Sequence, residues 1–409
     1  MTVRILHTAD LHLDSPLRSL AMKDDRLAAQ VRSASRQALE TMVQYCIDED
    51  VAAFLISGDL YDGQERSAKT AAYLAAQMHR LAQAGVQVFY IKGNHDAENP
   101  IAGEIDLPSN VHVFEGRGEK VQLGGHPLFI HGVSFRDRHA PESLLPKYTA
   151  PEPGAVNIAM MHTSLAGAEG HDLYAPVSVG ELVGAGFDYW ALGHIHKRAV
   201  HSETPWVVMP GMPQGRDIGE AGPKSATLLT VERGEISVSE VATSVVEFRR
   251  CDCDLTGVET DEDMRAALQS ALQAQAGRGA AILRLRLMGQ TSLAWQLRQL
   301  ADAWRAQADE IAESIGTLWI EKMTLDVTPL SQDAADSAVS EVQQLMTEIA
   351  AEPASRDGLR QELSQILGLL PAEQRRALAP DAEAQEALLQ QLTDDAVLAM
   401  AAQMRGAGT

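Results

Sequence analysis

The sequence predicts a mixed α/β protein whose largest part is a sandwich of two β-sheets with helices on the outside. Two observations lead to this fold class. The first 91 residues alternate apolar strand patterns with helical patterns, as in strand-helix-strand units. From residue 111 onward, short strand patterns follow one another closely. A two-sheet sandwich with outer helices accommodates both the parallel unit and the strand-rich half that follows it.

The N-terminal part alternates three strand patterns with two helical patterns. Residues 3–8 read as a buried strand, and the apolar period of residues 32–48 indicates a helix that leads into a second strand at residues 52–56. Residues 66–84 are again helical and precede a third strand at residues 86–91. We expect the three strands to be parallel, so that their carboxyl ends meet at one edge of the sheet.

The strand-rich half contains eight further strand patterns. They lie at residues 111–114, 120–123, 128–133, 156–161, 189–192, 206–209, 225–231 and 236–241. Together with the N-terminal part, they define a large domain over residues 1–245.

A chain of 409 residues exceeds the size of a single core, so further domains are expected. Residues 246–330 alternate helix and strand patterns twice, which predicts a small α+β domain. Residues 331–409 show no strand pattern, and Pro353, Pro371 and Pro380 divide them into three or four helices. The apolar stripes of these helices need a partner surface, either on this chain or on another protein.

The composition is that of a soluble globular protein. Hydrophobic residues make up 45% and charged residues 22% of the chain, and no apolar run approaches the about 20 residues that a membrane helix needs. The N-terminus runs directly into a strand pattern and lacks the features of a signal peptide. The three cysteines, Cys46, Cys251 and Cys253, form no disulfide framework. We therefore expect a cytoplasmic protein that does not contact a membrane.

The charge is strongly acidic and unevenly distributed. The formal net charge is -22, which disfavours autonomous binding of nucleic acid. Residues 301–409 contain 7 basic and 19 acidic residues, a balance of -12, so the last quarter of the chain carries more than half of the excess. Two bound divalent ions would add positive charge where a phosphate binds. Phosphodiester chemistry is therefore still compatible with the composition.

Two short motifs at strand ends offer metal-ligating side chains. Asp10 and His12 are two residues apart, so they project to the same side of an extended segment. Gly58 permits a tight turn that presents Asp59 at a strand tip, where its oxygens could bridge two ions about 3.5 to 4 Å apart. Taken alone, the first motif is more often a structural coincidence and the second is usually only a turn.

The tetrapeptide Gly93, Asn94, His95, Asp96 carries more information. Asn94 offers a carbonyl oxygen to a metal, which leaves His95 free to face the substrate and donate a proton to an oxygen of the reacting phosphate. Asp96 is the predicted carboxylate partner that holds the imidazole of His95. The alternative for the tetrapeptide alone is a polar loop after a strand.

Two further strand patterns end at histidines, one at His162 and the other at His194 and His196. The five motifs occur in the order that is typical of the calcineurin-like metallophosphoesterase superfamily, which this sequence resembles. The resemblance implies an α/β/β/α sandwich with a dinuclear metal centre. By position, it implies one ion held by Asp10, His12, Asp59 and His196 and a second held by Asp59, Asn94, His162 and His194.

Within this superfamily the sequence is most similar to SbcD-type nuclease subunits, and in particular to their YhaO-like branch. Residues 5–13, 174–176, 188–197 and 210–216 carry this resemblance. It is strong over residues 1 to about 245 and faint over 246–330, where such proteins carry a capping domain. Asp217 stands where a histidine is expected, which puts local DNA contacts in doubt rather than catalysis.

The resemblance implies a two-metal DNA phosphodiesterase, an exonuclease or endonuclease of DNA repair. It implies manganese as the metal, with iron or zinc also compatible with the nitrogen and oxygen donors. It further implies DNA and an SbcC-type coiled-coil ATPase as partners, and it admits a homodimer. The alternatives are a phosphodiesterase or phosphatase for small nucleotides on the same site, and a subunit that serves mainly as a scaffold.

Several other polar residues have weaker claims on function. His171 and Tyr174 either rim the site or belong to a solvated loop, and Arg216 is a candidate substrate contact. His7 and His131 lie in apolar strand patterns, so we interpret them as core histidines. The Cys251 and Cys253 pair lacks the second pair of a zinc site, and Arg284 and Arg286 fit an exposed sheet face better than a phosphate site.

Overall fold

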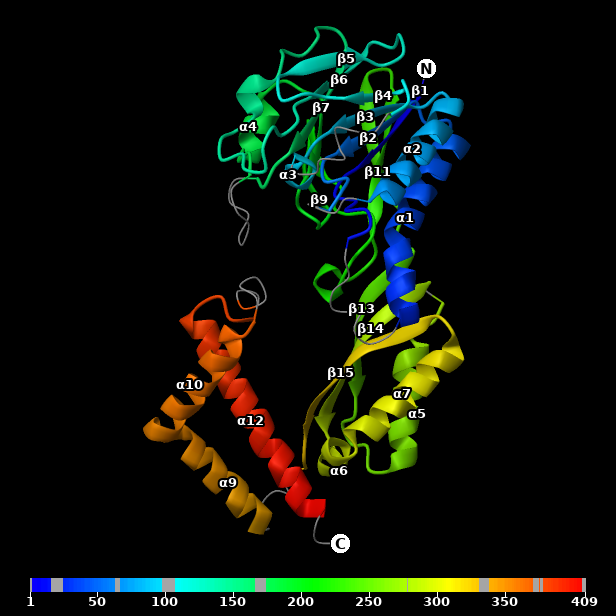
Figure 1. The fold of residues 1–409 in the computed structure, drawn as a ribbon. Helices are drawn as coiled ribbons and strands as arrows, with labels where there is room; N and C mark the ends of the chain where they lie inside the picture. The colour runs from blue at the N-terminus through cyan, green and yellow to red at the C-terminus, as the bar shows by residue number, and fades with distance from the viewer. Residues whose placement is uncertain are drawn as a thin grey trace. The chain divides into compact units, whose positions relative to one another are not determined.

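The computed structural model describes residues 2–15, 25–62, 67–97, 107–165, 174–277, 279–330, 338–370, 375 and 378–406. The chain forms two compact units (Figure 1). The first comprises Met1–Arg249 with Arg278–Ile282, and the second comprises Arg250–Gly277 with Leu283–Thr409. None of the helices in these described ranges has the length and hydrophobicity needed to cross a bilayer.

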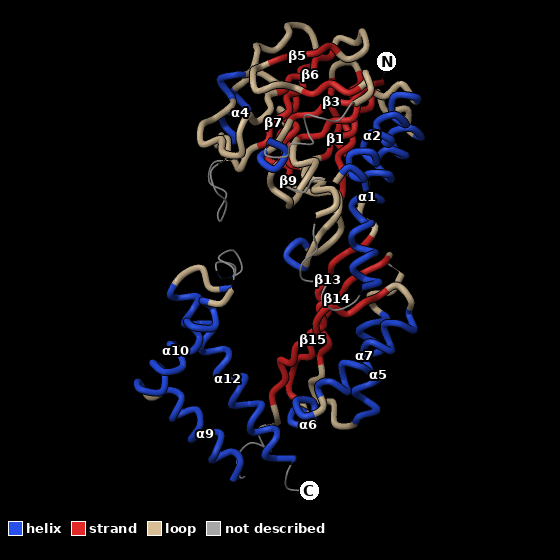
Figure 2. Tube along the Cα trace, viewed as in Figure 1, coloured by secondary structure: helices blue, strands red, loops and turns tan. Residues whose placement is uncertain are grey.

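The first unit is built on two six-stranded sheets (Figure 2). The first sheet has the order β12 (Glu235–Ala242), β11 (Ser225–Glu232), β1 (Thr2–Thr8), β2 (Ala53–Ser57), β3 (Gln87–Ile91) and β4 (Val111–Val113). The second has the order β5 (Glu119–Gln122), β6 (Leu128–Gly132), β7 (Val156–His162), β8 (Tyr189–Gly193), β10 (Trp206–Met209) and β9 (Ala199–Glu203).

The central strands of both sheets are parallel. In the first sheet, β1, β2, β3 and β4 pair in parallel, whereas β11 and β12 are antiparallel additions at one side. In the second sheet, β6, β7, β8 and β10 pair in parallel and the two outer strands are antiparallel. Since parallel strands end at the same sheet edge, each sheet delivers several loops to one edge.

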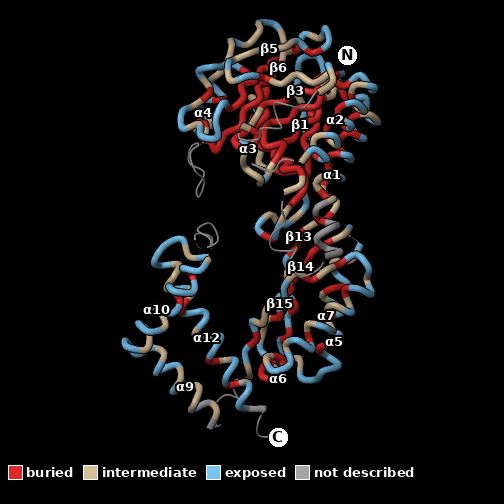
Figure 3. The backbone as a smooth tube through the Cα atoms, viewed as in Figure 1, coloured by how far each residue is buried: buried red, intermediate tan, exposed pale blue. Residues whose placement is uncertain are grey.

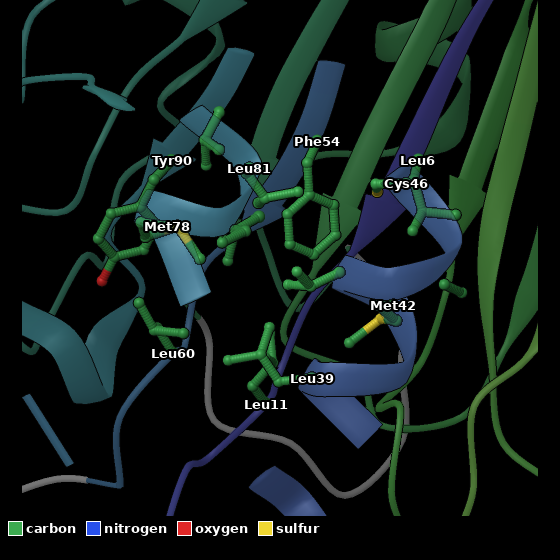
Figure 4. Packing of buried hydrophobic residues seen from close by; sticks show 14 of the residues in the cluster. Leu6, Leu11, Leu39, Met42, Cys46, Phe54, Leu60, Met78, Leu81 and Tyr90 are labelled. Carbon is green, nitrogen blue, oxygen red and sulfur yellow. The ribbon is translucent and has the colours of Figure 1, made fainter. Parts of the chain in front are cut away.

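Two helices cover the outer face of the first sheet, α1 (Asp25–Asp48) and α2 (Ala68–Gln83). Figure 4 shows Leu39 and Met42 of α1 and Met78 and Leu81 of α2 beside Phe54 of β2, in one apolar cluster. All five side chains are buried. Apolar residues of α1 recur at three- to four-residue spacing, and this packing explains that period.

A second apolar layer lies between the two sheets. It joins inward-facing residues such as Ile5 and Leu55 of the first sheet to Ile158 and Tyr189 of the second. A third layer covers the outer face of the second sheet around Trp190, and short helix α4 (Val179–Gly184) contributes to it. The α/β/β/α sandwich predicted from the sequence is therefore confirmed.

The second unit contains a three-stranded sheet and two groups of helices. The sheet has the order β13 (Val246–Asp254), β14 (Ala280–Gln290) and β15 (Leu318–Thr328), with helices α5 (Asp261–Gln273), α6 (Ala294–Gln299) and α7 (Ala301–Ile315). Cys251 and Cys253 are buried, free thiols on β13. Burial raises the pKa of both thiols, to about 11 and about 12, so they are neutral core residues rather than metal ligands.

The C-terminal helices of the second unit are α9 (Ala338–Ala351), α10 (Pro353–Gly368) and α12 (Ala382–Gly406). Helix α12 packs on α6, where Ala401 meets the buried ring of Trp295. In Figure 3 these three helices are mostly exposed or intermediate, whereas the two large sheets are mostly buried. The C-terminal segment thus packs back on the second unit at one place and leaves other apolar positions in solvent.

The structure also contains elements that the sequence patterns did not predict. These are α4, β9, β13 and the single turn α3 (Asn94–Ala97). Helix α4 has a recognisable signal, a capping box in which Ser178 and Glu181 satisfy each other's backbone amides. Strand β9 is half exposed and polar, so it lacks the apolar pattern by which buried strands are recognised.

Candidate metal centre

Five segments of the first unit carry the predicted ligands to one place. Asp10 and His12 follow β1, Asp59 follows β2, and Asn94 begins the turn after β3. From the second sheet, His162 ends β7, and His194 and His196 follow β8. Because these strands are parallel neighbours in their sheets, their carboxyl ends converge. All of the ligands that the resemblance implies therefore lie in a single cluster.

Two groups of donor atoms contain predicted ligands only. One group consists of Asp10, His12 and His196, and the other of Asp59, His162 and His194. A third group joins His12 to Asp62 and His95, which are not among the predicted ligands. Within each group the donor atoms lie within 4.8 Å of one another. Nε2 of His12 and Nε2 of His196 are 3.2 Å apart. Each group therefore has the size of a single ion site.

Asp59 lies between the two groups. Its Oδ2 is 3.4 Å from Nε2 of His162 and 3.9 Å from Nε2 of His12. Its Oδ1 accepts a hydrogen bond of 3.0 Å from the backbone N–H of His95. One carboxylate thus faces a histidine of each group, which is the position of a bridging ligand.

Asn94 completes the second group. Its side-chain oxygen lies 3.1 Å from Nε2 of His162 and 3.2 Å from Nδ1 of His194. Asn94 is buried, at 5% exposure, although its amide is polar. A buried carbonyl oxygen that faces two imidazole nitrogens is a suitable donor for a metal ion.

The backbone of the site is held in sparsely populated conformations. Asp10, His12, Asp59 and His194 all have positive φ, between 41° and 101°. A positive φ is uncommon in residues other than glycine. Such conformations cluster at functional sites, where surrounding contacts enforce them. Gly93 has a different reason to be glycine, because a Cβ there would collide with Oδ1 of Asp59 and with the His162 ring. The close approach of these loops therefore depends on a residue without a side chain.

The histidine rings are oriented by acceptors on the side away from the ion sites. Nδ1 of His162 lies 2.9 Å from the backbone oxygen of Ser57, and Nδ1 of His196 lies 2.8 Å from Glu220. Nδ1 of His12 lies 3.5 Å from Asp62. Metal-ligating histidines are commonly held in this way, since the outer acceptor selects the tautomer that leaves the other nitrogen free for the metal.

The titratable groups of the cluster are strongly perturbed by burial and by one another. Desolvation raises the pKa of Asp10 to about 6 and lowers the pKa of His12 to about 4. Burial opposes protonation of His162, but the adjacent Asp59 raises its pKa to about 9. Burial likewise opposes ionisation of Asp59, yet His162 holds the pKa of this carboxyl well below its usual range. Bound cations would compensate these buried carboxylates and lone pairs.

His95 lies outside the two groups of predicted ligands and forms the third group of donor atoms with His12 and Asp62. Its ring is partly exposed and meets the ring of His12 edge to face, with 4.9 Å between centroids. The carboxylate nearest to the ring is that of Asp62, whose Oδ1 is 3.6 Å from Nδ1 of His95. Burial favours the neutral acid, but the His12 ring and the Ser15 hydroxyl lower the pKa of Asp62. Asp62 is therefore an anion that faces two histidines.

This arrangement differs from the expectation that Asp96 holds the imidazole of His95. Oδ1 of Asp96 accepts a hydrogen bond from the backbone N–H of Tyr61, and Oδ2 accepts one from the backbone N–H of Gly93, both at 3.0 Å. Asp96 is buried on the first turn of α3, where it ties together the loops after β2 and β3. The carboxylate that faces the His95 ring is Asp62, at 3.6 Å, and sequence reasoning missed it because it lies in a different loop.

Arg216 is placed at the edge of the metal centre through Glu220. Glu220 lies on a short 3-10 helix (Ile218–Glu220) and accepts hydrogen bonds from the Arg216 backbone and guanidinium at 2.8 and 2.9 Å. Burial opposes its ionisation, but His196 and Arg216 lower its pKa. Nη2 of Arg216 is itself 3.2 Å from Nδ1 of His196. Glu220 thus links a predicted substrate contact to a predicted metal ligand.

The remaining predicted residues have clear positions, with one exception. The Tyr174 ring lies 5.1 Å from the His194 ring, centroid to centroid, at the rim of the site. His171 lies outside the residues that the structure describes.

His7 and His131 are fully buried and hydrogen-bonded, which confirms them as core residues. In the second unit, Arg284 pairs with Glu321 and Arg286 with Asp252, as expected for a sheet face rather than for a phosphate site.

The chemistry of the cluster suits two divalent ions. Its donors are carboxylate oxygens, imidazole nitrogens and one amide oxygen, without sulfur. Such donor sets bind manganese, iron or zinc in preference to soft metals. The partly exposed ring of His95 lies next to the predicted ligands, at a place accessible to a bound phosphate ester.

Comparison with known proteins identifies two family models along the chain. The model of the calcineurin-like phosphoesterases matches residues 3–198, which include all of the predicted ligands. The model of the middle domain of metallophosphoesterase YhaO matches residues 248–328, which contain the three-stranded sheet of the second unit.

The chain is also similar to individual proteins. It is 33% identical over 316 residues to the metallophosphoesterase YhaO of Bacillus subtilis, covering 76% of each chain. It is 27% identical over 203 residues to the DNA double-strand break repair protein Mre11 of Methanocaldococcus jannaschii, covering 47% of this chain and 51% of that protein. Over 142 residues it is 31% identical to a subunit of the nuclease SbcCD of Rhodobacter capsulatus, covering 33% of this chain and 32% of that protein.

Proposed function

Because the chain belongs to the calcineurin-like phosphoesterases, in their YhaO-like branch, we propose that it is a two-metal phosphodiesterase that cleaves DNA. Membership makes it a metal-dependent phosphoesterase. The observation that carries the proposal is the position of Asp59, whose Oδ2 faces His162 at 3.4 Å and His12 at 3.9 Å. A carboxylate shared between two donor groups is the hallmark of a dinuclear hydrolytic site.

We assign the ligands of the two ions from this geometry. Asp10, His12, Asp59 and His196 would hold one ion, and Asp59, Asn94, His162 and His194 the other. Manganese is the metal that we propose. When bound, the two ions supply an activated water and positive charge for a phosphate ester.

The residues around the ions have separate roles in this proposal. His95 faces the substrate and donates a proton to the leaving 3' oxygen. The carboxylate of Asp62, 3.6 Å from Nδ1 of His95, keeps the ring oriented. Tyr174 and Arg216, which contact His194 and His196, serve as substrate contacts at the rim of the site.

DNA as the substrate rests on the relatives. Mre11 of Methanocaldococcus jannaschii is a DNA double-strand break repair protein, and the SbcCD protein of Rhodobacter capsulatus is part of a nuclease. We propose the same substrate class and a role in DNA repair for this protein. The acidic C-terminal quarter, at -12 from residue 301, is unsuited to DNA, so binding would depend on the first unit and its metal ions.

We propose that the C-terminal helices bind a coiled-coil ATPase of the SbcC type. Helices α9, α10 and α12 form an apolar groove of about 590 Å³. Ile349, Ile366 and Met400 line it and are 47%, 60% and 53% exposed. Apolar side chains on three helices around one groove fit the helix-in-groove mode of recognition. An amphipathic helix of the ATPase would cover these side chains.

Metal-dependent hydrolysis tests the proposed function. The purified protein, stripped of metal and resupplied with manganese, is incubated with labelled duplex, hairpin and single-stranded DNA and with bis-p-nitrophenyl phosphate. We expect cleavage of DNA and of the small diester only when metal is present. Hydrolysis of small nucleotides without cleavage of any DNA would replace the proposal with a small-nucleotide phosphodiesterase. Absence of all hydrolysis would favour a scaffold role.

A further inference from the structure

A pocket of the first unit lies next to one of the proposed metal ligands. Its volume is about 350 Å³, and His196 forms part of its wall. The other walls are the segment after His196, the loop before β11 and the end of β12. His196 belongs to one of the two donor groups, so the pocket adjoins the place where a phosphate ester would be cleaved.

The lining of this pocket combines apolar residues with three basic side chains. Lys197, Arg198 and Lys224 contribute cations, and Glu240 is the one acidic residue among the lining residues. Arg198 is neutralised by Glu240, at 3.0 Å, and also donates to the Thr227 hydroxyl at 2.6 Å. The two lysines form no ion pair with any residue in the described part of the chain. In a protein with a net charge of -22, two unpaired cations in one pocket are an unexpected concentration of positive charge.

Lys224 is held in the pocket in a way that favours an anion. Its ammonium has a weak backbone acceptor, the oxygen of Ala221 at 3.4 Å. Burial lowers the pKa of Lys224, and the more distant carboxylates of Glu220 and Glu247 only offset this. A half-buried cation without a close counter-ion is unfavourable, and a bound anion would relieve that penalty.

The same lysine connects the pocket to the loop of Arg216. A Cβ on Gly215 would lie 3.4 Å from Cε of Lys224, so the lysine stem packs directly over this glycine. Arg216, the next residue, contacts His196 and Glu220. Lys224 therefore packs on the loop that carries Arg216, and Arg216 in turn contacts the predicted metal ligand His196.

We propose that this pocket is a phosphate-binding subsite that holds a backbone phosphate of a polynucleotide, next to the phosphate that is cleaved. Lys224 and Lys197 would contact the phosphate oxygens, while Arg198 shapes the wall through its bonds to Glu240 and Thr227. A volume of 350 Å³ is at the lower end of small-molecule sites and suits one phosphate with its sugar. This inference rests on the proposed function, because it requires a polynucleotide substrate.

Charge-neutralising variants of the full chain test the subsite. The variants are Lys224→Gln and Lys197→Gln, and Lys120→Gln is the matched control. Lys120 lies on β5 of the same unit, outside the pocket lining, and bonds Glu152 on the surface. Equilibrium binding of a labelled single-stranded oligonucleotide is measured against salt concentration, together with kcat/KM for an oligonucleotide and for bis-p-nitrophenyl phosphate.

A lost phosphate contact has a defined signature in these measurements. For each pocket variant, we expect the slope of log affinity against log salt to become shallower by about 0.7, the value for one contact to a single strand. The ratio of kcat/KM for the oligonucleotide to that for the small diester should fall about three- to tenfold, since one charge-assisted contact is lost. The Lys120→Gln control should keep the wild-type slope and ratio. Lys197 is exposed, so its variant provides the test if Lys224→Gln does not fold.

Three results would overturn the inference. If both pocket variants have the same salt slope and the same kcat/KM ratio as Lys120→Gln, the pocket contacts no substrate phosphate. Inhibition by inorganic phosphate is compared between the pocket variants and the wild-type protein. If the variants are inhibited more weakly while their salt slopes for the oligonucleotide are unchanged, the pocket binds a free anion instead. If the wild-type protein neither binds nor cleaves any oligonucleotide, the proposed function itself fails, an outcome distinct from a failure confined to the variants.

Discussion

The carboxylate of Asp62 lies 3.6 Å from Nδ1 of His95, and the same oxygen lies 3.5 Å from Nδ1 of His12. One side chain thus faces both the proposed proton donor and a proposed metal ligand. Ser15 donates a hydrogen bond of 2.7 Å to its other oxygen, which holds the carboxylate in place. This relationship gives Asp62 a role that connects the metal centre to the chemistry of the leaving group.

Asp62→Asn should lower kcat for a phosphodiester by about 10- to 100-fold, the usual effect of losing an outer-shell carboxylate. The physical reason is that an amide lacks the negative charge that faces the imidazole rings of His95 and His12, so it orients them less well. KM should change less than kcat, because Asp62 does not face the substrate directly. Steady-state kinetics on bis-p-nitrophenyl phosphate checks this, with metal content measured in parallel. An unchanged kcat at full metal occupancy would remove Asp62 from the mechanism.

His95→Asn should abolish turnover and leave both metals bound, because we assign His95 to the substrate and not to either ion, although its ring forms a separate donor group with His12 and Asp62. Elemental analysis of the purified variant measures the metal content, and hydrolysis of DNA measures turnover. His162→Asn serves as the comparison, since His162 faces Asp59 and Asn94 within a group. Loss of one equivalent of metal from His95→Asn would identify His95 as a ligand instead.

Asp59→Asn should be the most damaging of the single ligand changes. The Asp59 carboxylate faces histidines of both groups, so its loss weakens both ions, whereas His12→Ala chiefly affects one. Titration of manganese into each metal-free variant should show two weakened sites for the first change and one for the second. If Asp59→Asn retained two tight sites, the bridging role would be refuted.

The stability of the protein should depend on pH through His7. Burial lowers the pKa of His7 from 6.5 to about 3, so below pH 6.5 the unfolded chain binds a proton that the folded chain does not. This contribution therefore destabilises the fold as pH falls, by about 2 kcal/mol between pH 7 and pH 5. His7→Gln removes the titrating ring and should reduce the pH dependence by that amount. Urea unfolding of both metal-free proteins at the two pH values measures the difference, and parallel pH profiles would contradict the prediction.

A chain that ends near Pro329 should keep metal-dependent phosphodiesterase activity and lose association with the SbcC-type ATPase. Truncation also uncovers Trp295, which packs against Ala401, so a point variant gives the cleaner test. Ile366→Asp places a charge in the apolar groove, and Leu369→Asp, at a residue that is 86% exposed and outside the groove lining, is its control.

Co-purification with the ATPase measures this association. We expect Ile366→Asp to reduce it at least tenfold and the Leu369 control to retain it, because a buried charge without a partner is strongly unfavourable. Undiminished binding by Ile366→Asp and by the truncated chain would exclude this segment as the docking site. An insoluble truncation would indicate that the helices serve mainly to cover the second unit.

Much of the fold and the ligand cluster could be predicted from the sequence by itself. The strand patterns before Asp10, Asp59 and Asn94 are strongly apolar, and the strands β1, β2 and β3 pair in parallel as expected. Because the carboxyl ends of parallel strands share one edge, residues just after those ends must lie near one another whatever the rest of the chain does. The histidines His162 and His194 follow the same rule in the second sheet. Local periodicity and the geometry of a parallel sheet together determined where the ligands lie.

Only the tertiary structure decided which residues surround the ligands. Asp96 is adjacent to His95 in sequence, yet its oxygens bind backbone amides, and the carboxylate at the His95 ring is Asp62. Glu220 reaches His196 from a short helix that has no apolar pattern of its own. The direction of a side chain in a loop depends on backbone turns and on packing between distant segments, and neither has a period along the chain. For this physical reason the outer carboxylates and the basic pocket beside His196 became visible only in the folded protein.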